Sequence, residues 1–338
     1  MKKLLFLILI SSFCFSQQVK FETLLTDNIS IRAIQIWDGK VWYAGTDSKF
    51  GYVSLKNSSD KKQIKLSEKN LQFRTLAQDK KYFYAINIES PAYFFEIGKK
   101  NLTSKIIFTD TVKTAFYDAL HFGKDDFGIA LSDPNGTIPN IAVRKINKNS
   151  WQKCEEDCFP QFKINEAAFA ASNTNISSSK KYLWFATGGS FSRIFRQNIQ
   201  SCKWQTFNTP FVQGSSSQGI FSIDFFDENF GIAVGGDYTQ QNENINNIAT
   251  TNDGGKTWQI QASGKNAGYM TCVKFRPKSK GKDILAVGDQ HISFSSDYGK
   301  TWTKISDEKN LYACEWIDEN TAVFAGKDRI VKMNFQKD

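Results

Sequence analysis

The sequence predicts an all-β, seven-bladed β-propeller, with six or eight blades as the alternatives. One observation is a strand signature, a large apolar residue followed by alanine, that recurs every 39 to 56 residues. Such spacing is near the period of four-stranded propeller blades. Polar hairpin turns follow the strand-like runs upstream of several copies, and two matching Asp-Gly turn motifs occur near the C-terminus. The seven repeat alanines are Ala44, Ala85, Ala130, Ala186, Ala233, Ala286 and Ala325.

Residues 1–16 have the layout of a secretory signal peptide: two lysines, a short apolar stretch and small residues at the exit. We expect cleavage after Ser16, which leaves 17–338 as one propeller domain in the periplasm or outside the cell. The alternative is a lipoprotein anchored through Cys14, but the bulky Phe13 lies directly before this cysteine, where small residues are expected. The apolar stretch is too short for a membrane span, and no later segment is apolar enough for one.

A spare strand at the start of the mature chain is expected to close the ring. The last repeat stops one strand short, and the run from Val19 to Leu25 precedes the first repeat. Pairing this run with the final blade would remove exposed sheet edges. The small repeat alanines have a related reason, because neighbouring sheets approach most closely near the axis.

Two segments read Ser/Thr-x-Asp-x-Gly-x-Thr-Trp and are 44 residues apart. In such a turn the carboxylate can accept backbone N–H bonds, the glycine supplies a positive φ, and the tryptophan packs between sheets. The residues that carry the motif are Asp253, Gly255, Trp258, Asp297, Gly299 and Trp302. Fainter echoes surround Trp151 and Trp204, with the aspartate lost.

These motifs resemble Asp-boxes, the bacterial neuraminidase (BNR) repeats found between outer strands of propeller blades. With the signal peptide and the repeat spacing, the chain resembles the photosystem II stability and assembly factor-like propellers, of the WD40/YVTN/BNR-like repeat class. That resemblance implies an exported, protein-binding scaffold without catalytic turnover or cofactor. The lysine-rich, arginine-poor composition differs from the arginine-rich partner surface of photosynthetic members, so their partner is not carried over.

Sialidases and related glycoside hydrolases share these boxes and provide the alternative function. Their catalysis needs an arginine cluster, a tyrosine nucleophile and acidic residues. The Arg-Ile-Pro segment expected near the start of such enzymes is missing, and the seven arginines show no matching pattern. The sequence therefore favours binding over catalysis, with an envelope or secreted protein, or else a glycan, as the partner.

The charge distribution and the histidine count argue against nucleic-acid and metal binding, whereas the cysteines leave the disulfide connectivity open. The charge of +9 comes from lysines scattered through turns, which is typical of solvated hairpin tips and not of a nucleic-acid interface. Two histidines, neither near a cysteine pair, predict no metal site. The five cysteines of the mature chain leave the disulfide connectivity open: Cys154, Cys158, Cys202, Cys272 and Cys314.

A ring of charge on one face is the candidate binding surface. A carboxylate falls three or four residues after six of the seven repeat alanines, and three arginines lie near the same face. The ring could recognise a cationic or polar partner, or hold a cation through oxygen ligands. Alternatively, aspartate simply favours tight turns and the arginines pair with neighbouring carboxylates. The residues are Asp47, Glu89, Asp133, Asp237, Asp289, Asp328, Arg32, Arg74 and Arg329.

Overall fold

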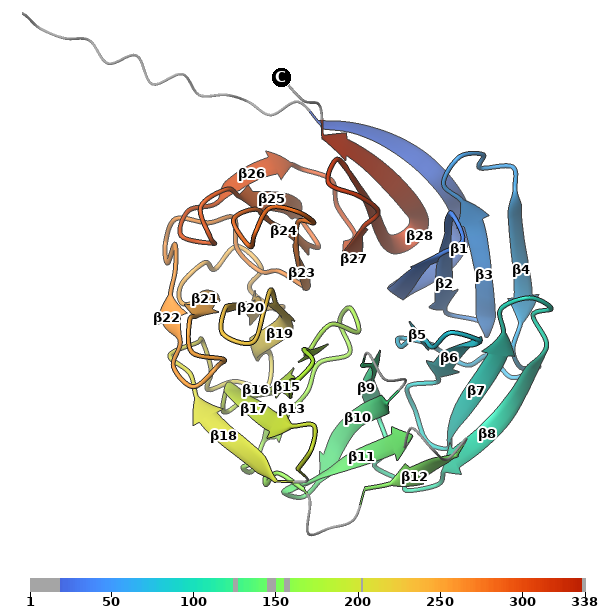
Figure 1. Cartoon of the computed structure of the whole chain (residues 1–338), viewed down its shortest axis with the longest axis horizontal. Coiled ribbons are helices and arrows are strands. Elements are labelled where there is room, and N and C mark those ends of the chain that lie inside the picture. Colours follow the sequence, from blue (N-terminus) through green and yellow to red (C-terminus); the bar gives the residue numbers. More distant parts are fainter. Residues whose placement is uncertain (1–18, 124–126, 145–149, 155–158, 202, 336–338) are drawn as a thin grey trace, which may run out of the picture.

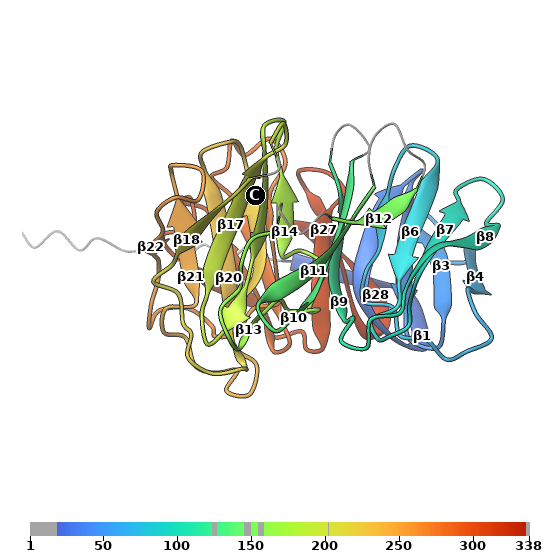
Figure 2. The same cartoon turned by 90° about the horizontal axis from the view of Figure 1, so that it is seen from below.

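The computed structural model describes residues 19–123, 127–144, 150–154, 159–201 and 203–335. The predicted signal peptide, Cys158 and Cys202 lie outside these ranges. The described chain is all-β, and its sheets stand side by side around a central channel (Figure 1). Seen from the side they form a short cylinder (Figure 2). The described residues contain no helix that is long and apolar enough to cross a bilayer.

The strands form six hydrogen-bonded sheets. The first contains, in spatial order, β27 (Leu311–Trp316), β28 (Thr321–Phe335), β1 (Val19–Trp37), β2 (Lys40–Gly45), β3 (Lys49–Ser54) and β4 (Lys61–Lys65). The second contains β5 (Ala77–Gln78), β6 (Tyr82–Ile86), β7 (Ala92–Gly98) and β8 (Ser104–Asp110). The third contains β12 (Trp151–Lys153), β11 (Ile138–Arg144), β10 (Gly128–Asn135) and β9 (Tyr117–Phe122).

Three further sheets complete the circle. The fourth contains β14 (Ile176–Ser178), β15 (Tyr182–Ala186), β17 (Arg193–Asn198) and β18 (Trp204–Asn208). The fifth contains β13 (Glu166–Ala167), β16 (Gly188–Gly189), β19 (Gln218–Phe225), β20 (Gly231–Asp237), β21 (Ile248–Thr251) and β22 (Gln259–Ile260). The sixth contains β23 (Cys272–Phe275), β24 (Ile284–Gly288), β25 (His291–Ser295) and β26 (Thr303–Ser306).

The expectation of seven blades is wrong, because the described strands form six sheets. The seven alanine repeats are all present, but the first and last share one sheet. β1 pairs with β28 from Val19↔Phe335 to Ser30↔Lys327 and then continues, without leaving the strand, into pairing with β2. A count of sequence repeats therefore exceeds the count of hydrogen-bonded sheets by one.

Closure of the ring by the N-terminal strand is confirmed. Val19 pairs with Phe335 and Thr26 with Arg329, in antiparallel register. This pairing places Phe21 against Phe324, with ring centroids 6.4 Å apart, beside the buried Met333 and Phe335. The first and last strands of the described chain thus cover one another's edges and one part of the core.

The seven repeat alanines are fully buried, at 0% exposure each. Each lies in a central strand of its sheet, packed among apolar side chains of the neighbouring sheet. The aromatic residues fill the wider space farther out, as with the stacked Trp184 and Phe225, whose ring centroids are 3.9 Å apart. The alternation of small and large side chains fits sheets that diverge from an axis.

The two Asp-Gly turns have the same hydrogen bonds. Asp253 accepts from the Thr257 amide at 2.9 Å and the Thr257 hydroxyl at 2.7 Å. Asp297 accepts from the corresponding groups of Thr301 at 2.9 and 2.6 Å. In each turn the glycine has a positive φ (Gly255 and Gly299), and the indole N–H of the following tryptophan (Trp258 and Trp302) donates to that glycine's carbonyl. The Asp253 turn also touches the fourth sheet, since Gly254 accepts from Trp184 at 2.9 Å.

Candidate functional site

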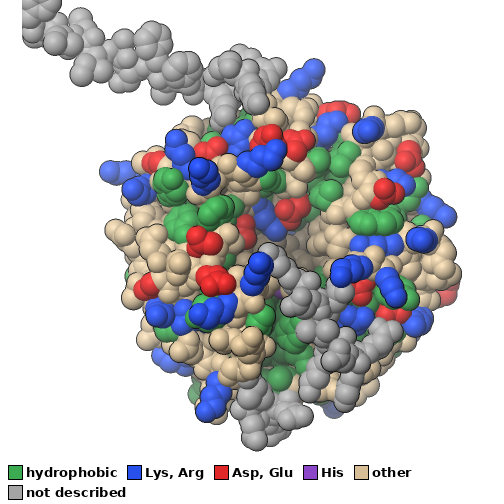
Figure 3. Space-filling view, viewed as in Figure 1, with side chains coloured by type: hydrophobic (Ala, Val, Ile, Leu, Met, Phe, Trp, Pro, Cys, Tyr) green, Lys and Arg blue, Asp and Glu red, His purple; other side chains and the backbone are tan. Residues whose placement is uncertain are grey.

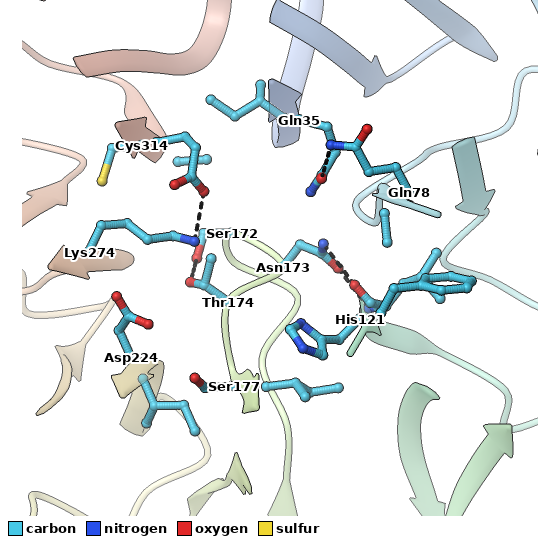
Figure 4. A pocket seen from close by; sticks show the side chains of 18 residues that line it. Gln35, Gln78, His121, Ser172, Asn173, Thr174, Ser177, Asp224, Lys274 and Cys314 are labelled. Carbon is cyan, nitrogen blue, oxygen red and sulfur yellow. Dashed lines mark hydrogen bonds and ion pairs between the residues drawn. The ribbon is translucent and has the colours of Figure 1, made fainter. Parts of the chain in front are cut away.

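A segment between β13 and β14 crosses the channel, and we call residues 168–175 the plug. Its contacts reach strands on several sides. The Ala171 carbonyl accepts from Arg32 at 3.1 Å, and the Ser172 hydroxyl donates to the Thr271 carbonyl at 2.6 Å. The Asn173 amide donates to the Leu120 carbonyl at 3.1 Å (Figure 4) and to the Leu76 carbonyl at 2.9 Å. The channel is therefore bridged by hydrogen bonds near its middle.

The two ends of the channel have different chemistry. The Arg mouth is the end at which Arg32 and Arg74 lie near Asp133 and Asp289, two of the carboxylates that follow repeat alanines. The opposite end, which we call the Lys mouth, contains Lys274, Glu315 and Asp224 and has a cavity of about 230 Å³. Basic and acidic side chains lie in the hollow at the centre of the face seen in Figure 3.

At the Arg mouth the structure brings part of the predicted ring together. The Arg32 guanidinium lies over the Tyr312 ring, 4.1 Å from its centroid. Burial raises the pKa of Asp289, an effect that Arg32 and a hydrogen bond from Gln241 oppose. Burial and the neighbouring Arg32 lower the pKa of Arg74, which Asp118 and Glu89 partly restore.

Other members of the ring have structural partners instead. Asp237 accepts from the Thr239 hydroxyl at 2.6 Å and from its amide at 2.9 Å, and these bonds outweigh burial and lower its pKa. Arg329 forms an ion pair with Glu308 at 2.7 Å. Asp47 and Asp328 lie in turns with φ of 57° and 64°. The contacts of Asp237 and Arg329 therefore support the alternative interpretation, in which aspartates stabilise turns and arginines pair with neighbouring carboxylates.

The sequence analysis missed Asp118, which lies in β9 among apolar neighbours and is 1% exposed. Neither carboxylate oxygen has a hydrogen-bond partner among the described residues, and one oxygen of Asp133 is also unpartnered. Burial and Asp133 raise the pKa of Asp118 well above its usual range, while Arg74 and the nearby Ala170 backbone oppose this. Burial also raises the pKa of Asp133 to about 6. A charged residue within a buried strand is the signal that could have identified the pair.

Replacing Asp118 with asparagine should raise stability at alkaline pH. A carboxyl whose pKa is higher in the folded protein than its ordinary 3.8 contributes stability that is lost as pH rises through the folded value. The wild-type free energy of unfolding should therefore fall as the pH rises above about 4, whereas D118N should lose less and exceed wild type at pH 8. Urea titrations from pH 4 to 8 measure this.

The exposed turn residue Asp38 provides the control, since D38N should follow the wild-type profile. A D118N variant that loses the same stability at every pH would show that Asp118 is ionised and paired with Arg74 in the folded protein.

The Lys mouth is built from an ion pair and two further titratable groups (Figure 4). Lys274 Nζ lies 2.7 Å from Glu315 Oε2, and these carboxylates, Glu315 and Asp224, raise the pKa of Lys274 against the effect of burial. Burial raises the pKa of Asp224 to about 6, although Lys274 opposes it. Burial and Lys274 lower the pKa of His121 to about 4, and its Nε2 lies 2.7 Å from the Ser178 hydroxyl.

Cys272 and Cys314 meet beside this cavity. Their sulfur atoms are 3.7 Å apart, and both are thiols that are at least 98% buried. Although burial alone would raise it, the Cys314 thiol and the charge of Lys274 lower the pKa of Cys272 to about 7. Burial raises the pKa of Cys314 well above its usual value.

We expect a small-molecule disulfide such as oxidised glutathione to join the two thiols, with transfer of their two electrons and two protons to the oxidant. Closing this loop should stabilise the fold by about 3–4 kcal/mol on the chain-entropy account. Peptide mapping and thermal melts with and without reductant measure it. In C314S the reductant should lower the melting temperature less than it does in the wild type; a wild-type melt that is insensitive to reductant would contradict the expectation.

These features define the class of the protein as an all-β propeller of six sheets with a plugged channel. No family model and no curated protein matches the chain. Solved structures show the fold. "YCF48 bound to D1 peptide" superposes with a TM-score of 0.64 at 12% identity, over 95% of this chain and 97% of the other. YCF48 from Cyanidioschyzon merolae superposes with a TM-score of 0.62 at 14% identity, over 94% of this chain and 98% of the other. The structure of U3-55K gives 0.64 at 12% identity, over 93% and 98%.

Proposed function

We propose that this chain is an exported, non-catalytic propeller that binds a protein or peptide partner at the Arg mouth. The observation that carries the proposal is Asp118, a carboxyl group buried beside Arg74 and Asp133 without a side-chain hydrogen-bond partner among the described residues. Buried polar groups are nearly always paired, so this arrangement is costly in the free protein. A partner that donates to these carboxyl groups would offset that cost.

The surroundings of Asp118 support a peptide in this role. Arg32 and Arg74 offer donors for backbone carbonyls or carboxylates, and the unpartnered oxygens of Asp133 and Asp289 offer acceptors. Tyr238 is 47% exposed, and its ring lies 6.3 Å from that of Phe221. Tyrosine and arginine are enriched among the residues that contribute most to binding at protein interfaces. A protein of the same fold, YCF48, has been solved with a peptide bound.

The test is affinity capture by the mature protein from its own envelope fraction, followed by titration with the captured partner. The R32Q/R74Q variant and the D47N/D289N/D328N variant should each weaken binding of that partner by at least about tenfold. Paired controls are K80Q/K180Q, which removes two exposed positive charges elsewhere, and E68Q/E243Q, which removes two exposed negative charges.

Folding of every variant is checked by thermal melting. Capture of one partner that is lost only in the mouth variants supports the proposal. Unchanged capture by both mouth variants, or turnover of fluorogenic sialosides or glycosides, would overturn it.

A further inference from the structure

A second cavity lies away from the channel, between the fifth and sixth sheets. We call it the rim pocket. It has a volume of about 440 Å³, within the range typical of small-molecule sites. Its walls come from the turn after β20, the loop after β22, and strands β25 and β26. The residues that line it are Asn242, Lys265, Asn266, Ala267, Gln290, His291, Trp302, Lys304, Asp307 and Lys309.

The charge of the rim pocket is positive. It contains three lysines, Lys265, Lys304 and Lys309, and one carboxylate, Asp307. Lys304 Nζ lies 2.6 Å from Asp307 Oδ1, so the charges of Lys304 and Asp307 balance one another. Two lysine charges remain in excess, and they come from different segments that converge on one cavity. An anion held between them would be attracted by both.

The floor of the pocket is buried and polar. His291 is 2% exposed; its Nδ1 lies 3.0 Å from the Ser293 hydroxyl, and its Nε2 has no hydrogen-bond partner among the described residues. Burial and Lys304 lower the pKa of His291 to about 4, an effect that the Tyr269 backbone and Asp307 oppose, so the ring is neutral.

The walls are held rigidly and carry amide groups. Asn266 donates to the Ala262 carbonyl and to Asn247 Oδ1, both at 2.9 Å, and accepts from the Gly268 amide at 2.9 Å. The Trp302 indole is held by its bond to Gly299, so its orientation beside the cavity is defined. At the edge, Gln290 donates to Gln241 at 3.1 Å, which leaves its own carbonyl oxygen available, and Asn242 is exposed.

We propose that the rim pocket binds a sugar acid, a small hydroxyl-rich molecule with one carboxylate. Lys265 and Lys309 receive the carboxylate, while Gln290 and Asn242 bind the hydroxyl groups. An inorganic anion would use the lysines but leave the neutral groups without partners. A peptide is disfavoured because the cavity has the size of a small molecule. Gln241 links this site to the Arg mouth, since it donates to Asp289 and accepts from Gln290, but the inference does not depend on the proposed function.

Glucuronate is the probe, with glucose and inorganic sulfate as comparison ligands, and binding to the full mature chain is measured by ligand-observed NMR and calorimetry. Wild type should bind glucuronate more tightly than either comparison ligand. The K265Q/K309Q variant should weaken glucuronate binding by about tenfold. N242A should weaken it with no effect on sulfate. K65Q, which removes an exposed lysine on β4, is the charge control and should change nothing.

The comparison ligands make the outcomes distinct. Equal binding of sulfate and glucuronate, with no effect of N242A, would reduce the site to a general anion site and overturn the proposal. Glucose binding as tightly as glucuronate would show that the lysines do not bind the carboxylate, and it would overturn the proposal. No saturable binding of glucuronate to the wild type at millimolar concentration would also overturn it.

Discussion

Glu166→Ala is expected to destabilise the protein by about 3–5 kcal/mol, because it breaks a buried ion pair and leaves Arg193 uncompensated. Glu166 is 1% exposed and accepts from Arg193 Nε at 2.9 Å and from the Thr187 hydroxyl at 2.6 Å. It also accepts from the Lys163 amide at 2.7 Å. These bonds join the segment that leads into the plug to the strands β16 and β17.

Urea unfolding of E166A measures the loss, and E243A, which removes an exposed glutamate, is the control. In the double variant E166A/R193A the loss should be smaller than the sum of the two single losses, because the charges are removed together. Additive losses would show that the two side chains do not act as a pair.

Leu25→Asp is expected to have a similarly large effect, about 3–5 kcal/mol, through the closure of the ring. Leu25 is 5% exposed, pairs with Ile330 of β28, and packs in the cluster that joins the first and last repeats. A carboxylate there would be buried without a partner or would separate the two strands. Separation of the strands would expose the long shared edge of β1 and β28.

Thr23 provides the matched control, since it lies in the same strand, pairs with Val331 and is exposed. T23D should stay within about 1 kcal/mol of wild type. Thermal melts and limited proteolysis near the N-terminus report both variants. Equal losses for L25D and T23D would mean that the strand as a whole, and not its buried face, closes the ring.

The repeat pattern was sufficient to predict the architecture but not the number of sheets. Ala44 and Ala325 mark separate repeats, and nothing in the spacing indicates that one strand, β1, joins their sheets. Short-range turn chemistry limits where strands start and end. Whether a strand continues past a bend into the next sheet depends on long-range pairing that turn residues do not report.

The candidate site was predicted only in part. The carboxylates after the repeat alanines indicated one face, and Arg32, Arg74, Asp133 and Asp289 do gather there. Asp237 and Arg329 come from the same pattern, yet they bond to Thr239 and Glu308. Asp118 follows no turn signature, and Asn173 belongs to a segment without regular structure. Their roles arise from partners far away in the chain, such as Leu76 for Asn173.

The amino-acid sequence by itself determined that this protein is a wheel of small sheets, since buried alanines and hairpin turns recur at blade spacing and a spare strand is available for closure. Tertiary structure alone decided that six sheets form, that a plug bridges the channel, and which charges remain unpaired. The physical reason is that burial and pairing depend on which distant segments meet. A local pattern can specify a turn or a strand. Which distant side chains contact a given carboxylate is decided only when the closed ring brings them together.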